Sequence, residues 1–185
     1  ATTYTTGMAV VKACQELRKK ICELGAEMLQ TEQENVDFDG SYVFCAEDEN
    51  KKVSLEEIGL KSTFFNNIEL QVVKQHSSPL SPPPFMVGMV EVEVDKETGN
   101  IDVLDYVAVV DCGTPINPNL ARVQTEGGIV QGIGMALFED VQYTDKGKIR
   151  NNSFMQYKLP TRVDVGNIRV EFESSYEPTG PFGVK

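Results

Sequence analysis

The sequence predicts an α+β fold in which a mixed or antiparallel sheet, with a long β-hairpin at about 85–111, packs against helices at about 6–29 and 118–139. Three observations indicate this class. An apolar stripe of helical period opens the chain, a Val-Glu-Val-Glu-Val alternation marks a strand, and an Asn-Pro pair precedes a second helical segment. Helices and strands follow one another without a regular βαβ rhythm, which favours α+β over a parallel α/β sheet.

The first helix is predicted from apolar residues that recur at alternating spacings of four and three. These residues are Val10, Cys14, Leu17, Ile21, Leu24 and Met28. Thr5 or Thr6 is expected to cap the start of this helix, because a threonine side chain can accept a hydrogen bond from a free backbone N–H.

A hairpin and a short helix are expected after it. Asp39-Gly40 separates two short β-prone runs, which is a strong hairpin signal. Residues 46–52 are mostly charged and predict a loop, and Ser54 begins a Ser-Leu-Glu-Glu segment that predicts a short helix ending near Gly59. Together residues 1–75 form a predicted N-terminal lobe.

Residues 76–84 are predicted to be an extended connection, because no helix or central strand tolerates their proline density. After them, Phe85–Asp95 and Ile101–Val110 predict two strands joined by a turn at 96–100. In the first strand valines alternate with acidic residues, so one face of the hairpin is expected to contact water.

The rest of residues 85–185, the second predicted lobe, contains a helix and a return to strands. Asn117 is the expected N-cap and Pro118 the first residue of a helix that runs to about Glu139. Residues 141–185 predict further strands, notably Ile168–Phe172, separated by turn-rich loops.

Composition excludes several classes of function. Net charge is −11, which argues against a nucleic-acid binder, and no apolar run is long enough to span a bilayer. The four cysteines form no Cys-x-x-Cys pair and the chain has one histidine, so no structural metal site is predicted. Four reduced thiols, with Cys14 packed on a helix face, indicate a cytoplasmic protein.

The most unusual segment is the second helix, which contains Gly127, Gly128, Gly132 and Gly134. Each glycine costs about 0.5–1 kcal/mol relative to alanine inside a helix, so a close neighbour or a ligand is expected beside them. Gln124 and Gln131 lie seven residues apart and therefore share a face. Amides on a glycine-bared surface suit a polar heterocycle. The alternative is that the glycines only permit tight packing against the hairpin.

Taken together, these motifs resemble one family. The order VEVEVDKETGNIDVLDYVAVVDCGTPINPNLARVQTEGGIVQGIGMALFED, then YKLPTRVD, then GPFGVK is similar to the C-terminal part of the molybdenum-binding subunit of the xanthine dehydrogenase / aldehyde oxidase family. ATTYTTGMAVVKACQEL is similar to the hydroxyl-rich segment of that subunit that contacts the pterin. The resemblance implies that both lobes are a fragment of one molybdopterin-binding domain.

The resemblance implies five cofactor-binding residues. Gln131 would contact the molybdenum cofactor, and Gly127 and Gly128 would let the helix approach it. Thr2 and Thr3 would lie near the pterin or its phosphate, the alternative being simple helix capping.

No catalytic residue is expected in the chain. In the family a glutamate that follows the Gly-x-Lys stretch within about four residues is the general base, and this sequence ends at Lys185. Glu126 and Glu139 are interpreted as ordinary helix charges. The isolated chain is therefore expected to be inactive.

The resemblance implies a molybdenum hydroxylase that acts on purines or similar N-heterocycles, or on aldehydes. Molybdenum–molybdopterin would be its cofactor in the complete enzyme. FAD and 2Fe-2S centres would lie on partner domains or subunits, since four scattered cysteines make no cluster motif. The alternative function is a non-enzymatic binding or assembly module that retains only the fold.

Overall fold

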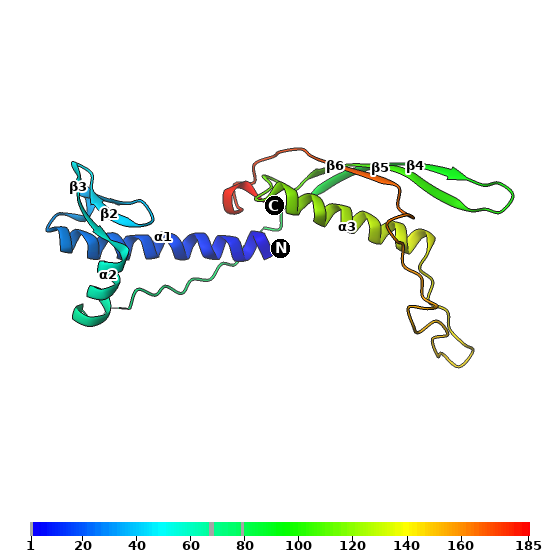
Figure 1. Ribbon diagram of the computed structural model, residues 1–185, viewed down its shortest axis with the longest axis horizontal. Helices are drawn as coiled ribbons and strands as arrows, with labels where there is room; N and C mark the ends of the chain where they lie inside the picture. Colours follow the sequence, from blue (N-terminus) through cyan, green and yellow to red (C-terminus); the bar gives the residue numbers. More distant parts are fainter. Residues whose placement is uncertain (1, 67–68, 79) are drawn as a thin grey trace. The chain divides into compact units, whose positions relative to one another are not determined.

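The structure is a computed structural model that describes residues 2–66, 69–78 and 80–185. It divides into two compact units, unit 1 (Ala1–Pro79) and unit 2 (Leu80–Lys185) (Figure 1). Each unit combines helices with a three-stranded sheet, so the α+β class is confirmed. Among the described residues, no helix has the length and hydropathy required to cross a bilayer.

Unit 1 is a long helix, α1 (Thr2–Leu29), packed on a small antiparallel sheet. The sheet has the order β1 (Val36–Phe38), β2 (Tyr42–Cys45), β3 (Asp48–Ser54). A short 3₁₀ turn at Gln33–Asn35 connects α1 to β1. The core of this unit contains Ile21, Leu24, Leu29, Val43, Val53 and Ile58.

Helix α1 starts earlier than the threonine caps predicted. Thr5 and Thr6 lie inside the helix, whose first described residue is Thr2. Tyr4 is buried, and its hydroxyl lies 2.9 Å from Ser78 Oγ, so a tertiary contact holds the first turn. The apolar stripe is buried only in its second half, and the expectation of a packed Cys14 is wrong because this side chain is exposed.

The β1–β2 hairpin confirms the Asp39-Gly40 signal, but the loop predicted at 46–52 is wrong. Most of these residues belong to β3, which pairs antiparallel with β2. Charged side chains on β3 are exposed, while Val53 is buried against the core. Sheet pairing outweighed the low strand propensity of this charged segment.

Helix α2 (Leu55–Lys61) starts where the sequence predicts. Ser54 Oγ accepts from the backbone N–H of Glu57, and the Glu57 carboxylate accepts from the Ser54 N–H at 2.8 Å, a reciprocal capping box. The helix passes through Gly59 and continues into one π-helical turn, η2 (Ser62–Asn66). The described residues between 69 and 84 form no helix or strand. This agrees with the proline-rich connection predicted over 76–84, of which residue 79 lies outside the described residues.

Unit 2 is a mixed sheet with one helix on its face (Figure 1). β4 (Phe85–Val94) pairs antiparallel with β5 (Ile101–Asp111), which confirms the long hairpin. β5 also pairs in parallel with β6 (Asn167–Phe172). The core between sheet and helix contains Val103, Ala108, Val110, Ile129, Ile133, Val165 and Val170.

Helix α3 (Pro118–Leu137) confirms the second predicted helix. Asn117 Oδ1 accepts from the Leu120 N–H at 3.1 Å, and Pro118 occupies the first helical position. The packing predicted between the hairpin and this helix is observed. The packing predicted between the hairpin and the first helix involves two different units and stays a prediction.

A long irregular segment follows α3. Of the strands expected over 141–185, the described residues form β6 and two isolated bridges, Gly113–Val184 and Tyr143–Ile149. Gly166 enters β6 with φ +62°, and an added Cβ there would collide with backbone oxygens of Val103 and Leu104. Only glycine allows this close approach.

Candidate functional site

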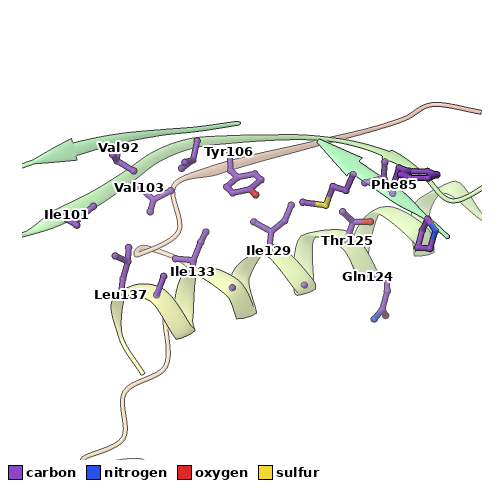
Figure 2. Close-up of a pocket in the computed structure, with 17 residues that line it drawn as sticks. Phe85, Val92, Ile101, Val103, Tyr106, Gln124, Thr125, Ile129, Ile133 and Leu137 are labelled. Carbon is purple, nitrogen blue, oxygen red and sulfur yellow. The ribbon is translucent and has the colours of Figure 1, made fainter. Parts of the chain in front are cut away.

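An apolar pocket of about 860 Å³ lies between the β4–β5 hairpin and α3 (Figure 2). Met86, Val90 and Val92 line it from β4, and Ile129 and Ile133 line it from α3. We call this space the hairpin pocket. The sheet and the helix present apolar side chains to each other, so the pocket is apolar. These side chains do not fill the distance between the two elements, so a space remains.

Few polar groups line the hairpin pocket. Tyr106 lies across Gly88, where an added Cβ would come within 2.5 Å of the Tyr106 hydroxyl. Thr125 donates its hydroxyl proton to the Ala121 carbonyl at 3.0 Å, so this group is already satisfied within the helix. In Figure 2 Thr125 points toward the strands, while Gln124 points away from them. The pocket therefore offers shape and apolar surface more than hydrogen bonds.

Three of the four glycines of α3 are exposed, and two of these, Gly128 and Gly132, line the hairpin pocket. Gly127, Gly128 and Gly132 are exposed, and an added Cβ at each would meet nothing within 4 Å. Only Gly134 is packed, because a Cβ there would collide with Glu139 and Pro160. Within the described chain, tight packing against the hairpin does not explain the other three glycines.

The same face of α3 carries no charge. Gln124, Gly127, Gly128, Gln131 and Met135 fall on one side of the helix by their spacing and are all exposed. We call these residues the glycine face. It combines bare backbone with two amides that can both donate and accept hydrogen bonds.

The charged residues near α3 have structural partners. Arg122 and Glu126 form an ion pair at 3.5 Å one turn apart. The Tyr157 hydroxyl donates to Glu139 at 2.5 Å, and this bond to the carboxylate raises the pKa of Tyr157. Glu139 therefore anchors the segment after the helix, and the interpretation of both glutamates as non-catalytic stays a prediction.

A polar cluster closes the end of β5. The Asp111 carboxylate accepts from Lys185 Nζ at 2.6 Å, from Ser175 Oγ at 2.6 Å and from the Gly113 N–H at 3.0 Å. These bonds, the lysine contact first, lower the pKa of Asp111 to about 2. The cluster fixes the C-terminal GPFGVK segment to the strand end from which α3 departs.

The GPFGVK segment exposes the aromatic side chain of Phe182. Pro181 and Gly183 are buried, while Phe182 between them is exposed and has φ +54°, a left-handed conformation unusual for a bulky residue. Thr114 N–H donates to the Gly183 carbonyl at 2.7 Å, and the Lys185 N–H donates to the Cys112 carbonyl at 2.9 Å. Hydrogen bonds on either side therefore impose the strained turn.

The two predicted threonines lie in unit 1. Thr2 and Thr3 are exposed in the first turn of α1, and no acidic side chain occupies that turn. The N-terminal end of a helix attracts anions through its dipole, so the predicted phosphate contact stays a prediction for Thr2 and Thr3.

The structure brings three of the five predicted residues together. Gly127, Gly128 and Gln131 share the glycine face of α3 in unit 2, whereas Thr2 and Thr3 belong to unit 1. Gln131 is exposed but does not line the hairpin pocket. The roles of all five residues stay predictions.

Sequence reasoning missed the hairpin pocket. Its apolar wall on β4 was interpreted only as a strand with one wet face. The missed signal is the continuous apolar run Phe85–Val90, since a strand covered on both faces lacks polar alternation. In the described part of the chain no three His, Cys, Asp or Glu side chains gather as metal ligands.

The molybdopterin cofactor-binding domain family matches residues 1–166. The chain is 26% identical to the carbon monoxide dehydrogenase large chain of Hydrogenophaga pseudoflava over 99% of its length and 23% of that protein. It is 29% identical to the putative xanthine dehydrogenase molybdenum-binding subunit of Escherichia coli K12, over 98% of its length and 25% of that protein.

A solved structure has a similar fold over the length of this chain. Quinoline 2-oxidoreductase from Pseudomonas putida 86 superposes with a TM-score of 0.80 and 27% identity, over 100% of this chain and 24% of the other. The chain therefore spans about a quarter of the length of the relatives that it matches.

Proposed function

Because the chain belongs to the molybdopterin cofactor-binding domain family, we propose that it forms part of the cofactor site of a molybdenum hydroxylase acting on purines or similar N-heterocycles. One observation carries the proposal: an exposed helix face of glycine backbone and uncharged amides, in a chain in which 24% of residues are charged. A surface of this kind costs helix stability and is expected to serve a ligand.

The glycine face fits the chemistry of a pterin. Space is open above Gly127, Gly128 and Gly132, so a planar group can approach the helix backbone closely. Pterin ring edges carry both donors and acceptors, which an amide matches and a single charge does not. Because the residues of this face are uncharged, an anionic dithiolene or phosphate would meet no acidic side chain on it.

We assign the residues as follows. Gly127 and Gly128 would provide close approach, and Gln131 would hydrogen-bond the cofactor. Thr2 and Thr3 would hold its phosphate at the start of α1. The bound cofactor supplies the redox chemistry, and these residues supply position.

The names of the relatives bear on the substrate class. Two of the three relatives above are named for N-heterocycles, xanthine and quinoline, and one for carbon monoxide. The names xanthine and quinoline support an N-heterocycle as the proposed substrate. Electrons would leave through 2Fe-2S and FAD centres on partner domains or subunits.

The test is Gly128→Leu in the full-length subunit, produced with its partner subunits. Gly128 also lines the hairpin pocket, and a leucine there adds a side chain to the open space above the helix backbone that we assign to the cofactor, so molybdenum and pterin content should fall several-fold. Thermal stability should stay the same or rise, because leucine favours a helix by up to about 1 kcal/mol over glycine. Asn119→Leu, also exposed on α3 but off the glycine face, is the matched control and should retain cofactor.

A second variant separates the roles of the face. Gln131→Leu keeps the helix and removes the amide, so it should loosen the cofactor or slow turnover while the fold survives. Full cofactor content in both Gly128→Leu and Gln131→Leu would refute the assignment of the glycine face.

A further inference from the structure

Strand β4 is exposed along its whole length, although it belongs to a sheet with a buried core. All ten of its residues are exposed, and in the described part of the chain it is one of the two edge strands of the order β4–β5–β6. An edge strand presents unpaired N–H and C=O groups, which soluble proteins usually protect with charges, proline or a covering segment. The segment Phe85–Val90 contains no charged residue and no proline.

This half is apolar on both faces. Met86 and Val90 line the hairpin pocket, and Val87 and Met89 alternate with them on the opposite face, 70% and 67% exposed. The other half of the strand differs, because Glu91 and Glu93 interrupt it. Two-sided apolar character is typical of strands that are covered on both faces.

We propose that Phe85–Val90 of β4 is a docking edge for an apolar extended segment supplied by the rest of the same subunit. The segment adds a strand to the free edge and covers the apolar faces beside it. The proposal rests on family membership and chain length, and it does not depend on the cofactor assignment.

The length of the relatives argues for this occupant. The chain corresponds to about a quarter of each relative, so a complete subunit has three further quarters in the same polypeptide. A tethered segment binds at high effective concentration. A second copy is a poorer occupant, because each chain carries a net charge of −11 and two such chains repel each other.

The test places a photo-crosslinking residue on the edge of the full-length subunit in its native complex. We would replace Val87 with p-benzoylphenylalanine, and Thr98 in the exposed hairpin turn as the matched control. Irradiation of the Val87 variant should give a cross-link within one polypeptide, to a peptide outside residues 1–185. The Thr98 variant should give several-fold less of it.

Three results would overturn the proposal. They are a cross-linked product of doubled subunit mass, a product with the mass of a partner subunit, and no cross-link above the Thr98 control. A melting curve like that of the unmodified protein shows that the variant is folded. Molybdenum content of the same preparation is measured separately, so an intramolecular cross-link without bound molybdenum refutes only the cofactor assignment.

Cysteine labelling gives an independent measurement. In the folded subunit Val87→Cys should react with a maleimide at least about tenfold more slowly than Thr98→Cys, because a paired and covered residue reacts only on local opening. In urea the two should react at similar rates. Equal rates in the folded subunit would contradict the docking edge even where a cross-link forms.

Discussion

Asp111 shows how a single carboxylate can hold two distant segments. Its partners Lys185 and Ser175 lie 74 and 64 residues further along the chain, and both bonds measure 2.6 Å. Lys185 Nζ also lies 5.3 Å from the centroid of the Phe85 ring, so the lysine links the strand end to the start of β4. Charge-assisted bonds of this kind are stronger than neutral ones.

We therefore expect Asp111→Asn to destabilise the chain at neutral pH. The pKa of Asp111 is lowered from 3.8 to about 2 in the folded state, so its stabilising effect is present above pH 3.8 and is lost as pH falls toward 2. Urea denaturation between pH 7 and pH 2 measures the free energy of unfolding of the unmodified chain and of Asp111→Asn. The difference between these two free energies should narrow below about pH 4. Asp145→Asn, in an exposed turn, is the control. A difference that is constant with pH would contradict the assigned role of the carboxylate.

The burial and the surroundings of single residues were harder to predict from the sequence than the helices and strands. Residue spacing places Gln124 and Gln131 on one face, yet only Gln124 lines the hairpin pocket. Cys14 has the helical spacing of a core residue and is exposed. Periodicity identifies a face of a helix, but neighbours that are far apart in the sequence decide how much of that face is covered.

At the scale of elements, glycines in the two long helices have opposite roles. Gly25 in α1 faces Val43, and an added Cβ would lie 2.6 Å from Val43 Cγ1 in a fully buried site. Gly127 in α3 faces open space. The first glycine is required by packing inside this chain and the second is not.

This contrast predicts opposite signs for the same substitution. In the 185-residue chain, Gly25→Ala should destabilise by about 1–3 kcal/mol through overpacking. Gly127→Ala should stabilise by about 0.5–1 kcal/mol through helix propensity. Denaturant titration of the two variants measures both free energies of unfolding. A stabilising Gly25→Ala or a clearly destabilising Gly127→Ala would contradict the packing described here.

Elements with local signals were predictable. The Asn117 cap, the Ser54 capping box and the Asp39-Gly40 turn each depend on residues a few positions apart, and all three are observed. β3 was missed because its charged segment becomes a strand only by pairing with β2. The pocket was missed because the distance between the hairpin and α3, which leaves it open, is not encoded in the residue pattern of either element.

At the scale of the whole molecule, the chain is expected to be an incomplete cofactor site. The proposed residues offer glycine backbone, amides and hydroxyls, and the relatives are about four times longer. We expect the isolated chain, produced in a host that makes the cofactor, to contain molybdenum and pterin far below one equivalent and to show no hydroxylase activity. Metal and pterin analysis beside the full-length subunit from the same host checks this. Stoichiometric metal in the isolated chain would contradict it.

The parallel pairing of β5 with β6 has a consequence for synthesis on the ribosome. Asp105 and Asn167, which pair across these strands, are 62 residues apart, whereas the β4–β5 turn closes locally. At about 5–20 residues per second, the second edge of β5 stays open for about 3–12 s before β6 emerges. During that interval Asp105 is an unpaired charge on an exposed edge, which discourages pairing with another nascent chain. Once β6 arrives, the same carboxylate binds Arg169 and Asn167, so one side chain first protects the edge and then helps to complete the sheet.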